Sequence, residues 1–287
     1  MPWSNFHSHT HYSDGSDAPA AYLQEAVRQG LYAYGFTCHA PTPFDLPWCM
    51  KKEAFGSYLS EITRLKTAFK GSLEVLCGLE VDYIPGKAYK TSVADYLPSL
   101  DYTIGSVHFV GFFANGLPWD IDGTSDGFAN GLDSIWKNDA RKAVEMYFGL
   151  LREMVLETGP SVIGHMDKIR MHNAQNRYFP EEAPWYRKQV TDTLEAFCST
   201  GAIMEVNTRG IYRGRFSEPY PAYWILELAG EMKIPLVLSS DAHKPHEITG
   251  KFAETAEMLL SLGITELCNY EQHTWVPRRF NTQGFLF

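Results

Sequence analysis

Short apolar runs alternate along the whole chain with longer stretches in which apolar residues recur at helical spacing. The short runs are predicted to be strands and cover residues 3–6, 33–38, 73–79, 102–107, 161–164, 202–206 and 236–239. The longer stretches are predicted to be helices and cover residues 19–29, 52–69, 139–157, 182–199, 220–232 and 247–261. Such alternation predicts an α/β fold, in which a parallel sheet is covered by helices.

Two arrangements of a parallel sheet fit this alternation. An open, doubly wound sheet binds ligands at one switch point, so only a few strands contribute residues. A closed barrel collects residues from the ends of many strands. The length of 287 residues fits one barrel or two small domains, and no repeat, low-complexity segment or obvious linker divides the chain.

Three irregular segments interrupt the alternation, at residues 41–50, 110–138 and 171–185. Each follows the carboxyl end of a predicted strand, where loops build substrate pockets in folds of this class. The segment at 110–138 is rich in Gly and Asp and is interpreted as a loop insertion.

Histidines mark the first predicted strand end, where the sequence reads His7-Ser8-His9. Residues two apart in a strand point to the same side, so these two imidazoles could bind one ion. Alone, the pair fits a solvated polar segment at least as well.

The pattern recurs at the later strand ends, which gives it weight. Imidazoles or carboxylates follow further apolar runs at His39, Glu80, His108, His165, Asp241 and His243. A single histidine of this kind is usually a hydrogen-bonded structural residue, but six of them, counting His7 and His9 with the four just named, are hard to explain independently. Polar groups that converge on one end of a barrel need a shared cation, which favours the barrel and a metal site at the carboxyl ends of its strands.

Together with Asp14, the sequence offers nine candidate metal ligands. One catalytic zinc needs about four ligand positions, so nine suit three divalent ions if Glu80 bridges two of them. Mixed imidazole and carboxylate donors favour zinc, iron or manganese over calcium or magnesium, without separating those three.

This ordered series resembles the PHP (polymerase and histidinol phosphatase) family. The resemblance spans residues 6–243 and implies a single domain over residues 1–287, folded as a distorted (β/α)7 TIM-like barrel with a trinuclear site. The length, Asp14 and the sequence at 205–208 resemble the histidinol-phosphate phosphatase branch. Asp14 stands where many relatives have a histidine, which leaves occupancy of the third metal position open.

The same resemblance implies how the ligands divide among the metals. His7, His9, Glu80 and Asp241 would hold the first ion. Glu80, His108 and His165 would hold the second. Asp14, His39 and His243 would hold the third.

Adjacent divalent ions favour hydrolysis of a phosphoester, because they lower the pKa of a shared water and clamp the attacking and departing oxygens. The expected nucleophile is a metal-bound hydroxide that bridges two ions. Asp241 and His243 are expected to act as catalytic residues that also handle protons. The group that protonates the leaving oxygen is not assigned by the sequence.

Side chains that bind the substrate are expected in the segments that follow the strands. Arg170 and Arg213 are predicted to bind and stabilise the phosphoryl group, and Arg209 to assist, because a guanidinium matches phosphate oxygens in pairs. Each arginine alone also fits a solvated loop. Lys244 is a weaker candidate. Trp119, with Asp120 and Asp122, is expected to contact the amine end of a substrate.

The composition narrows the partners of the protein. Lys and Arg number 25 against 34 Asp and Glu, and the resulting net charge of −9 disfavours general binding of nucleic acid. Five unpaired cysteines, no secretion signal and no apolar run of roughly 20 residues predict a cytoplasmic protein without a membrane span. The oligomeric state stays open.

The leading hypothesis is therefore a phosphomonoesterase that converts L-histidinol phosphate to L-histidinol in histidine biosynthesis. A phosphoesterase of the same family for another small phosphate ester, such as a nucleotide or a phosphorylated sugar, is the alternative. A proofreading nuclease is disfavoured by the acidic composition. A metal-binding barrel without enzymatic activity is a third class, but all nine ligand positions are filled.

Overall fold

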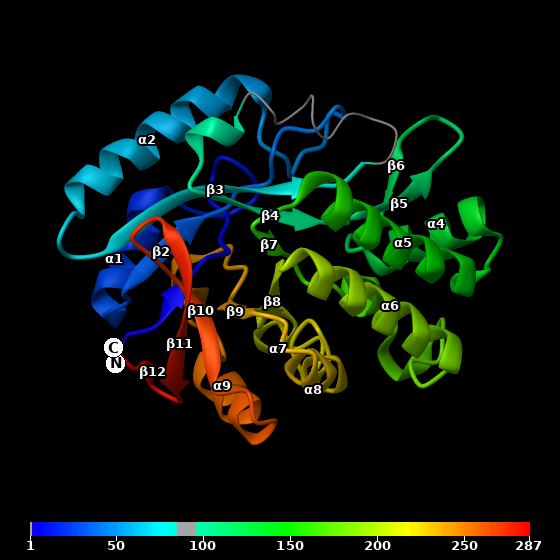
Figure 1. Cartoon of the computed structure of the whole chain (residues 1–287). Coiled ribbons are helices and arrows are strands. Elements are labelled where there is room, and N and C mark those ends of the chain that lie inside the picture. Colours follow the sequence, from blue (N-terminus) through cyan, green and yellow to red (C-terminus); the bar gives the residue numbers. More distant parts are fainter. Residues whose placement is uncertain (1, 85–95) are drawn as a thin grey trace.

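The structure is a computed structural model that describes residues 2–84 and 96–287. Seven strands form one sheet in the order β1-β2-β3-β4-β7-β8-β9, and every neighbouring pair is parallel (Figure 1). Their bounds are Ser4–Asn5 for β1, Ala33–Phe36 for β2, Glu74–Asp82 for β3, Tyr102–Ser106 for β4, Val162–Ile163 for β7, Ile203–Asn207 for β8 and Leu236–Ser239 for β9.

The first and last strands of this sheet meet just beyond their carboxyl ends. Ser8 forms an isolated parallel bridge with Ala242, and the backbone N–H of His9 donates to the carbonyl oxygen of Ala242 at 2.8 Å. This contact nearly closes the sheet into a barrel, which confirms the predicted barrel class over the open sheet.

Helices cover the outside of the barrel (Figure 1). The longer ones are α1 (Pro19–Gln29), α2 (Phe55–Ala68), α5 (Ala140–Thr158), α6 (Pro184–Thr200), α8 (Tyr223–Glu231) and α9 (Phe252–Ser261). Short helical turns complete the set at α7 (Arg209–Tyr212) and at the 3-10 helices η1 (Lys52–Ala54), η2 (Leu97–Ser99), η3 (Lys168–His172), η4 (Ala174–Asn176) and η5 (Pro245–Glu247). Among the described residues, no helix is long and apolar enough to cross a membrane.

Local sequence explains where these helices begin and end, as α1 illustrates. Pro19 occupies the first turn, where its missing N–H costs nothing and its fixed φ suits a helix. Tyr22 and Leu23 lie one turn before Ala26 on the buried face. Gly30 ends the helix at a φ of 72°, a left-handed conformation that glycine adopts without strain. The predicted bounds of this helix, residues 19–29, are confirmed.

The segment at 110–138 differs from the expected loop, because most of it is regular. It contains an antiparallel pair, β5 (Phe109–Phe112) and β6 (Pro118–Asp120), followed by α4 (Ser125–Trp136). The side chain of Thr124 caps α4 by accepting a hydrogen bond from the N–H of Gly127 at 3.0 Å. This segment follows β4 and lies on the same end of the barrel as the predicted ligands.

A second sheet at the C-terminus was not predicted. Its antiparallel strands are β10 (Glu266–Glu271), β11 (Thr274–Asn281) and β12 (Gly284–Phe285). Cys268 and Tyr270 pack into a buried cluster with residues from the amino-terminal parts of the barrel strands, including Ala33 and Val162. This sheet therefore covers the end of the barrel opposite the carboxyl ends of the strands.

Candidate metal centre

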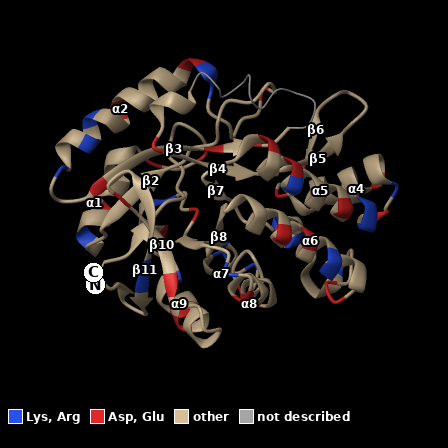
Figure 2. Ribbon diagram, in the orientation of Figure 1, with Lys and Arg blue, Asp and Glu red and all other residues tan. Residues whose placement is uncertain are grey.

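All nine predicted ligands lie at the carboxyl ends of barrel strands or in the segments that follow them. His7 and His9 follow β1, His39 follows β2, and Glu80 lies near the end of β3. His108 follows β4, His165 follows β7, and Asp241 and His243 follow β9. Charged residues lie mostly on the outer helices and connecting segments (Figure 2), whereas Glu80 and Asp241 are buried at the end of the barrel.

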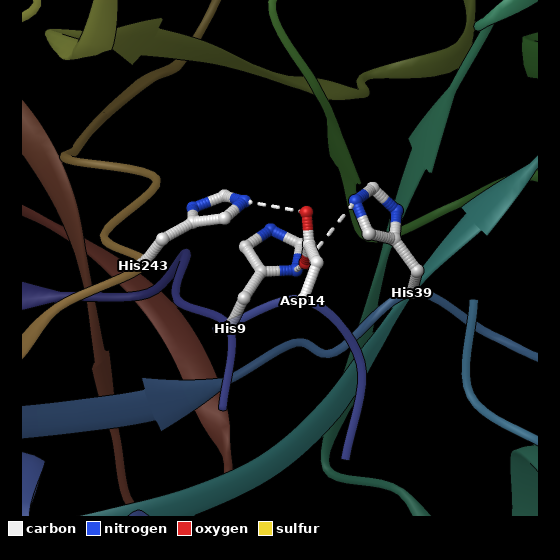
Figure 3. Close-up of side chains that lie close together, drawn as sticks. All are labelled: His9, Asp14, His39 and His243. Atoms are coloured by element: carbon white, nitrogen blue, oxygen red, sulfur yellow. Dashed lines mark hydrogen bonds and ion pairs between the residues drawn. The ribbon is translucent and has the colours of Figure 1, made fainter. Parts of the chain in front are cut away.

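The most accessible group contains His9, Asp14, His39 and His243, whose ligand atoms all lie within 4.8 Å of one another. Asp14 Oδ2 lies 3.0 Å from His243 Nε2, and Asp14 Oδ1 lies 3.5 Å from His9 Nδ1 and 3.9 Å from His39 Nε2. Figure 3 shows the three imidazoles arranged around the Asp14 carboxylate. The structure thus brings together residues from three separate segments, which follow β1, β2 and β9.

Two further groups of possible ligands share members with the first. One contains His7, His9 and Asp241, and the other contains His39, Glu80 and His108. His9 Nε2 lies 3.3 Å from Asp241 Oδ1. His9 therefore belongs both to the group that contains Asp14 and to the group that contains Asp241.

Glu80 is the centre of the arrangement. Its Oε2 lies 3.3 Å from His7 Nε2 and 3.1 Å from His39 Nδ1. Its Oε1 lies 3.1 Å from His165 Nε2 and 3.6 Å from His108 Nε2. Glu80 therefore occupies the position expected of a carboxylate that two ions share. His39, assigned above to the third ion alone, lies between Asp14 and Glu80 and contacts both groups.

Several buried ring nitrogens in this arrangement lack hydrogen bonds, which tests whether cations fit. Within residues 2–84 and 96–287, His7 Nε2, both ring nitrogens of His9, His39 Nδ1 and His165 Nδ1 find no hydrogen-bond partner. A buried polar atom left in this state costs about 1–3 kcal/mol. A divalent cation would satisfy these lone pairs, so the residues present fit metal ions.

The charge states of Glu80 and His9 also suit cations. Burial opposes ionisation of Glu80, but His39, His7 and His108 together hold its pKa well below the usual value. Burial and the nearby His243 and His39 lower the pKa of His9 to about 3. The carboxylate is therefore ionised and His9 is neutral, which are the forms that bind a metal.

Two buried carboxylates orient the imidazoles from behind. His7 Nδ1 donates to Glu205 Oε1 at 2.6 Å, and His108 Nδ1 donates to Asp82 Oδ1 at 2.7 Å. A proton fixed on Nδ1 leaves the Nε2 lone pair directed at the cluster. Glu205 also accepts the backbone N–H of His165 at 2.8 Å. These anchors were not predicted, although Asp82 could have been found because it follows Glu80 by two positions in one strand.

A cavity of about 230 Å³ opens beside the cluster. Its lining combines cluster residues with side chains of both charges and with aromatic rings. Besides Asp14, His39, Glu80, His108, His165, Asp241 and His243, the lining contains Trp48, Asp120, Asp122, Gly123, Lys168, Met171, Arg209, Gly210, Arg213, Arg215 and Tyr220.

Two of the arginines predicted from the sequence lie at this cavity. Arg209 Nη1 donates to the carbonyl oxygen of Asp241 at 2.8 Å, and Arg209 Nε lies 4.0 Å from Asp241 Oδ2. Arg213 is about half exposed, and its Nη1 lies 4.0 Å from Glu247 Oε1. Both guanidinium groups are therefore placed to meet an anion that reaches the cluster.

Arg170 is placed differently from our expectation. Its Nε donates to Glu181 Oε2 at 3.1 Å, its Nη2 donates to Glu218 Oε1 at 2.5 Å, and its Nη1 lies 3.6 Å from Asp167 Oδ2. Among the residues that the structure describes, Arg170 lines a different cavity and not the one beside the cluster. Because three carboxylates already contact this guanidinium, the geometry does not support direct binding of phosphate by Arg170.

Trp119 and Lys244 are also outside the described lining of the cavity. Trp119 is buried, and its ring packs on Phe128 with a centroid distance of 5.2 Å. It also lies directly against Gly131 of α4, where an added Cβ would be 2.1 Å from the indole. Lys244 is exposed at the start of η5. Trp119 therefore holds α4 against β6 and does not reach a substrate in this arrangement.

Lys168, Arg215 and Trp48 are cavity residues that were not proposed from the sequence. Arg170 was predicted at the site and Lys168 was not, although both occupy one short 3-10 helix, in which residues two apart point in different directions. Trp48 lies in the irregular segment 41–50 and makes edge contacts with His39 at 4.6 Å and His108 at 5.9 Å. That segment thus contributes to the pocket, as its position after β2 predicts.

Comparison with known proteins identifies relatives of one kind. The PHP domain model matches residues 5–209. The chain is 30% identical over 247 residues to a probable histidinol-phosphatase of Deinococcus radiodurans, covering 85% of this chain and 87% of that protein. It is 29% identical to the histidinol-phosphatase of Bacillus subtilis, covering 84% of this chain and 94% of that protein.

A solved structure supports the fold. The histidinol phosphate phosphatase from Lactococcus lactis, crystallised in complex with zinc, L-histidinol and phosphate, aligns with a TM-score of 0.70. The alignment covers 99% of both chains at 19% sequence identity. At this level of identity the likeness supports the TIM-like arrangement of strands and helices described above and not the details of the site.

Proposed function

Because this chain belongs to the PHP domain family, in its histidinol-phosphatase branch, we propose that it is a metal-dependent phosphomonoesterase that hydrolyses L-histidinol phosphate to L-histidinol and phosphate. The observation that carries this proposal is the donor cluster, in which His165 joins the eight residues of the three donor groups through Glu80, and which opens into a cavity with both cationic and acidic side chains. A substrate with an anionic phosphate at one end and an amine at the other complements such a lining.

The nine predicted ligands would hold up to three divalent ions, of zinc, iron or manganese. The unsatisfied ring nitrogens of His7, His9, His39 and His165 support this number of donors, and the Lactococcus lactis relative was crystallised with zinc. When bound, such ions activate a water molecule as the nucleophile and neutralise charge on the oxygens of the phosphoryl group.

The side chains of the cavity have separate tasks in this proposal. Arg209 and Arg213 bind non-bridging phosphoryl oxygens, on which negative charge accumulates during the reaction. Asp241 and His243 handle the proton that the leaving oxygen requires, in addition to holding metal. The His243 Nδ1 atom lies 3.0 Å from the backbone oxygen of Asp241, so a proton on Nδ1 is held there and Nε2 faces Asp14.

The L-histidinol end of the substrate is assigned to Asp120, Asp122 and Trp48. Asp122 Oδ2 lies 3.9 Å from His108 Nε2, whereas Arg209 contacts Asp241. The acidic pair and this arginine therefore adjoin different residues of the donor cluster. An ammonium group can pair with the carboxylates, and an imidazole ring can pack against the indole. The segment at 110–138 would thus select the leaving group.

We further propose that the chain is a single domain over residues 1–287 and that it acts in histidine biosynthesis in the cytoplasm. The contact of Ser8 with Ala242 joins the two ends of the barrel sequence and supports one domain. All five cysteines are free thiols, and four are buried, which supports a reducing compartment. The net charge of −9 supports a small phosphate ester over nucleic acid as the substrate.

A panel of phosphate esters tests this function. L-histidinol phosphate, p-nitrophenyl phosphate and mononucleotides are assayed with the purified protein in added manganese or zinc. We expect kcat/KM for L-histidinol phosphate to exceed the others by orders of magnitude. Equal or higher values for a nucleotide would favour the alternative of another small phosphate ester. Hydrolysis of none of them would favour a metal-binding barrel without enzymatic activity.

A further inference from the structure

Lys168 is a buried lysine at the cavity of a proposed phosphatase. It is the first residue of η3, three positions after the ligand His165, and its side chain is 6% exposed. Lysine is rarely buried unless its charge is paired. Its backbone is firmly held, because its N–H donates to the His165 carbonyl at 2.9 Å and to Tyr147 Oη at 3.1 Å. The side chain extends from this anchor to the lining of the cavity.

The ammonium group is only loosely paired where it lies. Lys168 Nζ is 3.3 Å from Asp122 Oδ2 and 4.0 Å from Asp241 Oδ2. Charge-assisted hydrogen bonds are usually about 2.7–2.9 Å long, so both contacts are long for their type. The group also lies 5.4 Å from the centre of the Tyr220 ring, which attracts a cation but accepts no strong hydrogen bond. An ammonium carries three donors, so this one can still bind an anion that enters the cavity.

Arg170 provides an internal comparison for this interpretation. It follows Lys168 by two residues and is similarly buried, but its carboxylate contacts begin at 2.5 Å and it lies outside the described lining of the cavity. That pattern is typical of a structural cation. Lys168 has longer contacts, faces the cavity and lies 4.0 Å from Asp241, a proposed metal ligand.

We propose that Lys168 is a phosphoryl-binding residue, whose Nζ donates to a non-bridging oxygen of the substrate's phosphoryl group and of the phosphate product. This inference rests on the proposed function only in that the substrate is a phosphate ester. It is independent of which alcohol leaves. The backbone contacts of Lys168 with His165 and Tyr147 then keep its side chain at the cavity before the anion arrives, so that its pairing with Asp122 balances charge but does not place the ammonium.

The alternative is that Lys168 only tethers the segment 110–138 to the barrel through Asp122. The two roles predict different effects when the side chain of Lys168 or of Asp122 is replaced. Loss of the lysine removes a phosphate contact, whereas loss of Asp122 breaks the tether but leaves the cation at the cavity. A pair of variants, Lys168→Met and Asp122→Asn, therefore separates binding from tethering.

The experiment compares metal-loaded wild type with Lys168→Met, Lys168→Arg and Asp122→Asn. Lys188→Met is the matched control, because Lys188 pairs with Asp192 on the exposed face of α6. Four quantities are measured: kcat/KM for L-histidinol phosphate and for p-nitrophenyl phosphate, the inhibition constant of inorganic phosphate, the bound metal and the melting temperature.

We expect Lys168→Met to lower kcat/KM for both esters by about 10²–10³-fold, the usual effect of removing one preorganised donor from a transition state. The inhibition constant of phosphate should rise at least about tenfold, as follows from the loss of roughly 1.4 kcal/mol or more of binding. Bound metal should stay unchanged. Lys168→Arg should recover part of the loss, Asp122→Asn should keep the inhibition by phosphate, and Lys188→Met should match wild type.

Unchanged inhibition by phosphate in Lys168→Met would overturn the proposal. Equal weakening of that inhibition in Lys168→Met and Asp122→Asn, with similar losses of melting temperature, would favour the tether instead. Loss of bound metal in Lys168→Met would show that the residue acts through Asp241, which also contradicts direct binding. A wild-type preference for another ester would refute the proposed substrate but leave this comparison intact, because p-nitrophenyl phosphate and inorganic phosphate report on the phosphoryl site alone.

Discussion

At the scale of single residues, the position of Asp241 shows how the backbone is constrained at the cluster. Its φ of 51° lies in the left-handed region, which residues with a Cβ rarely adopt. The next residue, Ala242, accepts a hydrogen bond from the N–H of His9 and donates to the carbonyl oxygen of His7. These contacts fix the strained turn and direct the Asp241 carboxylate at His9, 3.3 Å away. Strain of this kind concentrates at functional sites, and here it positions a ligand.

Glu205 allows a test of the carboxylates that orient the ligands. Glu205→Gln keeps the shape of the side chain but removes the negative charge that faces His7 Nδ1 at 2.6 Å. We expect metal affinity to fall about 10–100-fold, the usual cost of losing such a partner. Equilibrium dialysis against a competing chelator measures this change. Glu195→Gln, on the exposed side of α6, is the control, and equal affinities in the two variants would contradict the role of Glu205.

Asp120 allows a test of leaving-group selection. Asp120 lines the cavity without belonging to the three donor groups. Asp120→Asn should raise KM for L-histidinol phosphate about tenfold, because the amine of this substrate loses about 1.4 kcal/mol of pairing with the carboxylate. The value of kcat/KM for p-nitrophenyl phosphate, which has no amine, should stay within about twofold of wild type. Steady-state kinetics on both esters checks this. A parallel loss on both would place Asp120 with the phosphoryl group.

The ligand residues could be found from the sequence, whereas the cavity residues could be found only in part. His39, His108 and His165 each follow an apolar run, and the parallel strands of a barrel bring such positions together by symmetry alone. No such rule governs the segments between strands. Lys168 and Arg170 differ only in which side of a 3-10 helix they occupy, and composition carries no information about that direction.

At the scale of elements, the barrel strands and outer helices follow from periodicity, but the C-terminal sheet does not. In β11, Pro277 and the two arginines Arg278 and Arg279 argue against a strand, because proline cannot donate to a ladder. The strand forms nonetheless, since Cys268 of β10 pairs opposite Pro277 and the apolar face covers the barrel. Similarly, Gly127 and Gly131 weaken the helical signal of α4, although Gly131 is required where the Trp119 ring approaches.

The covering role of this sheet is tested at Trp275. Its ring packs against Phe6 at 5.0 Å, Tyr270 at 5.2 Å and Tyr102 at 5.7 Å, at the end of the barrel away from the metals. Trp275→Ala should lower the free energy of unfolding by roughly 2–4 kcal/mol, somewhat less than for a fully buried tryptophan. Denaturant unfolding measures the loss. Bound metal and kcat should stay near wild type, and Trp275→Phe should recover most of the stability. A loss of metal at unchanged stability would contradict this separation of the two ends.

At the scale of the whole molecule, closure of the barrel is what completes the site. The donors come from residues as far apart as His7 and His243, and the contacts of Ser8 and His9 with Ala242 place the first and last strands side by side. The cost of this arrangement is a set of buried, ionised carboxylates and unsatisfied imidazoles at one end. Burial without a counter-charge is unfavourable, so the cations proposed for catalysis should also contribute to the stability of the fold.

Removal of metal tests this coupling between the site and the fold. A ligand that binds only the folded state stabilises it by about 4 kcal/mol at a thousandfold excess over its dissociation constant. A change of about 1 kcal/mol shifts the melting temperature of a domain of 150–250 residues by roughly 2–4 °C. Chelation should therefore lower the melting temperature of this protein by several degrees, and added manganese or zinc should restore it. Calorimetry of the chelated and reloaded protein measures the difference. In His243→Ala, which removes a partly exposed donor of the Asp14 group, the same treatment should produce a smaller shift. Identical melting of the wild type with and without metal would mean that the donors tolerate burial unaided, and the cluster would then need another explanation than cation binding.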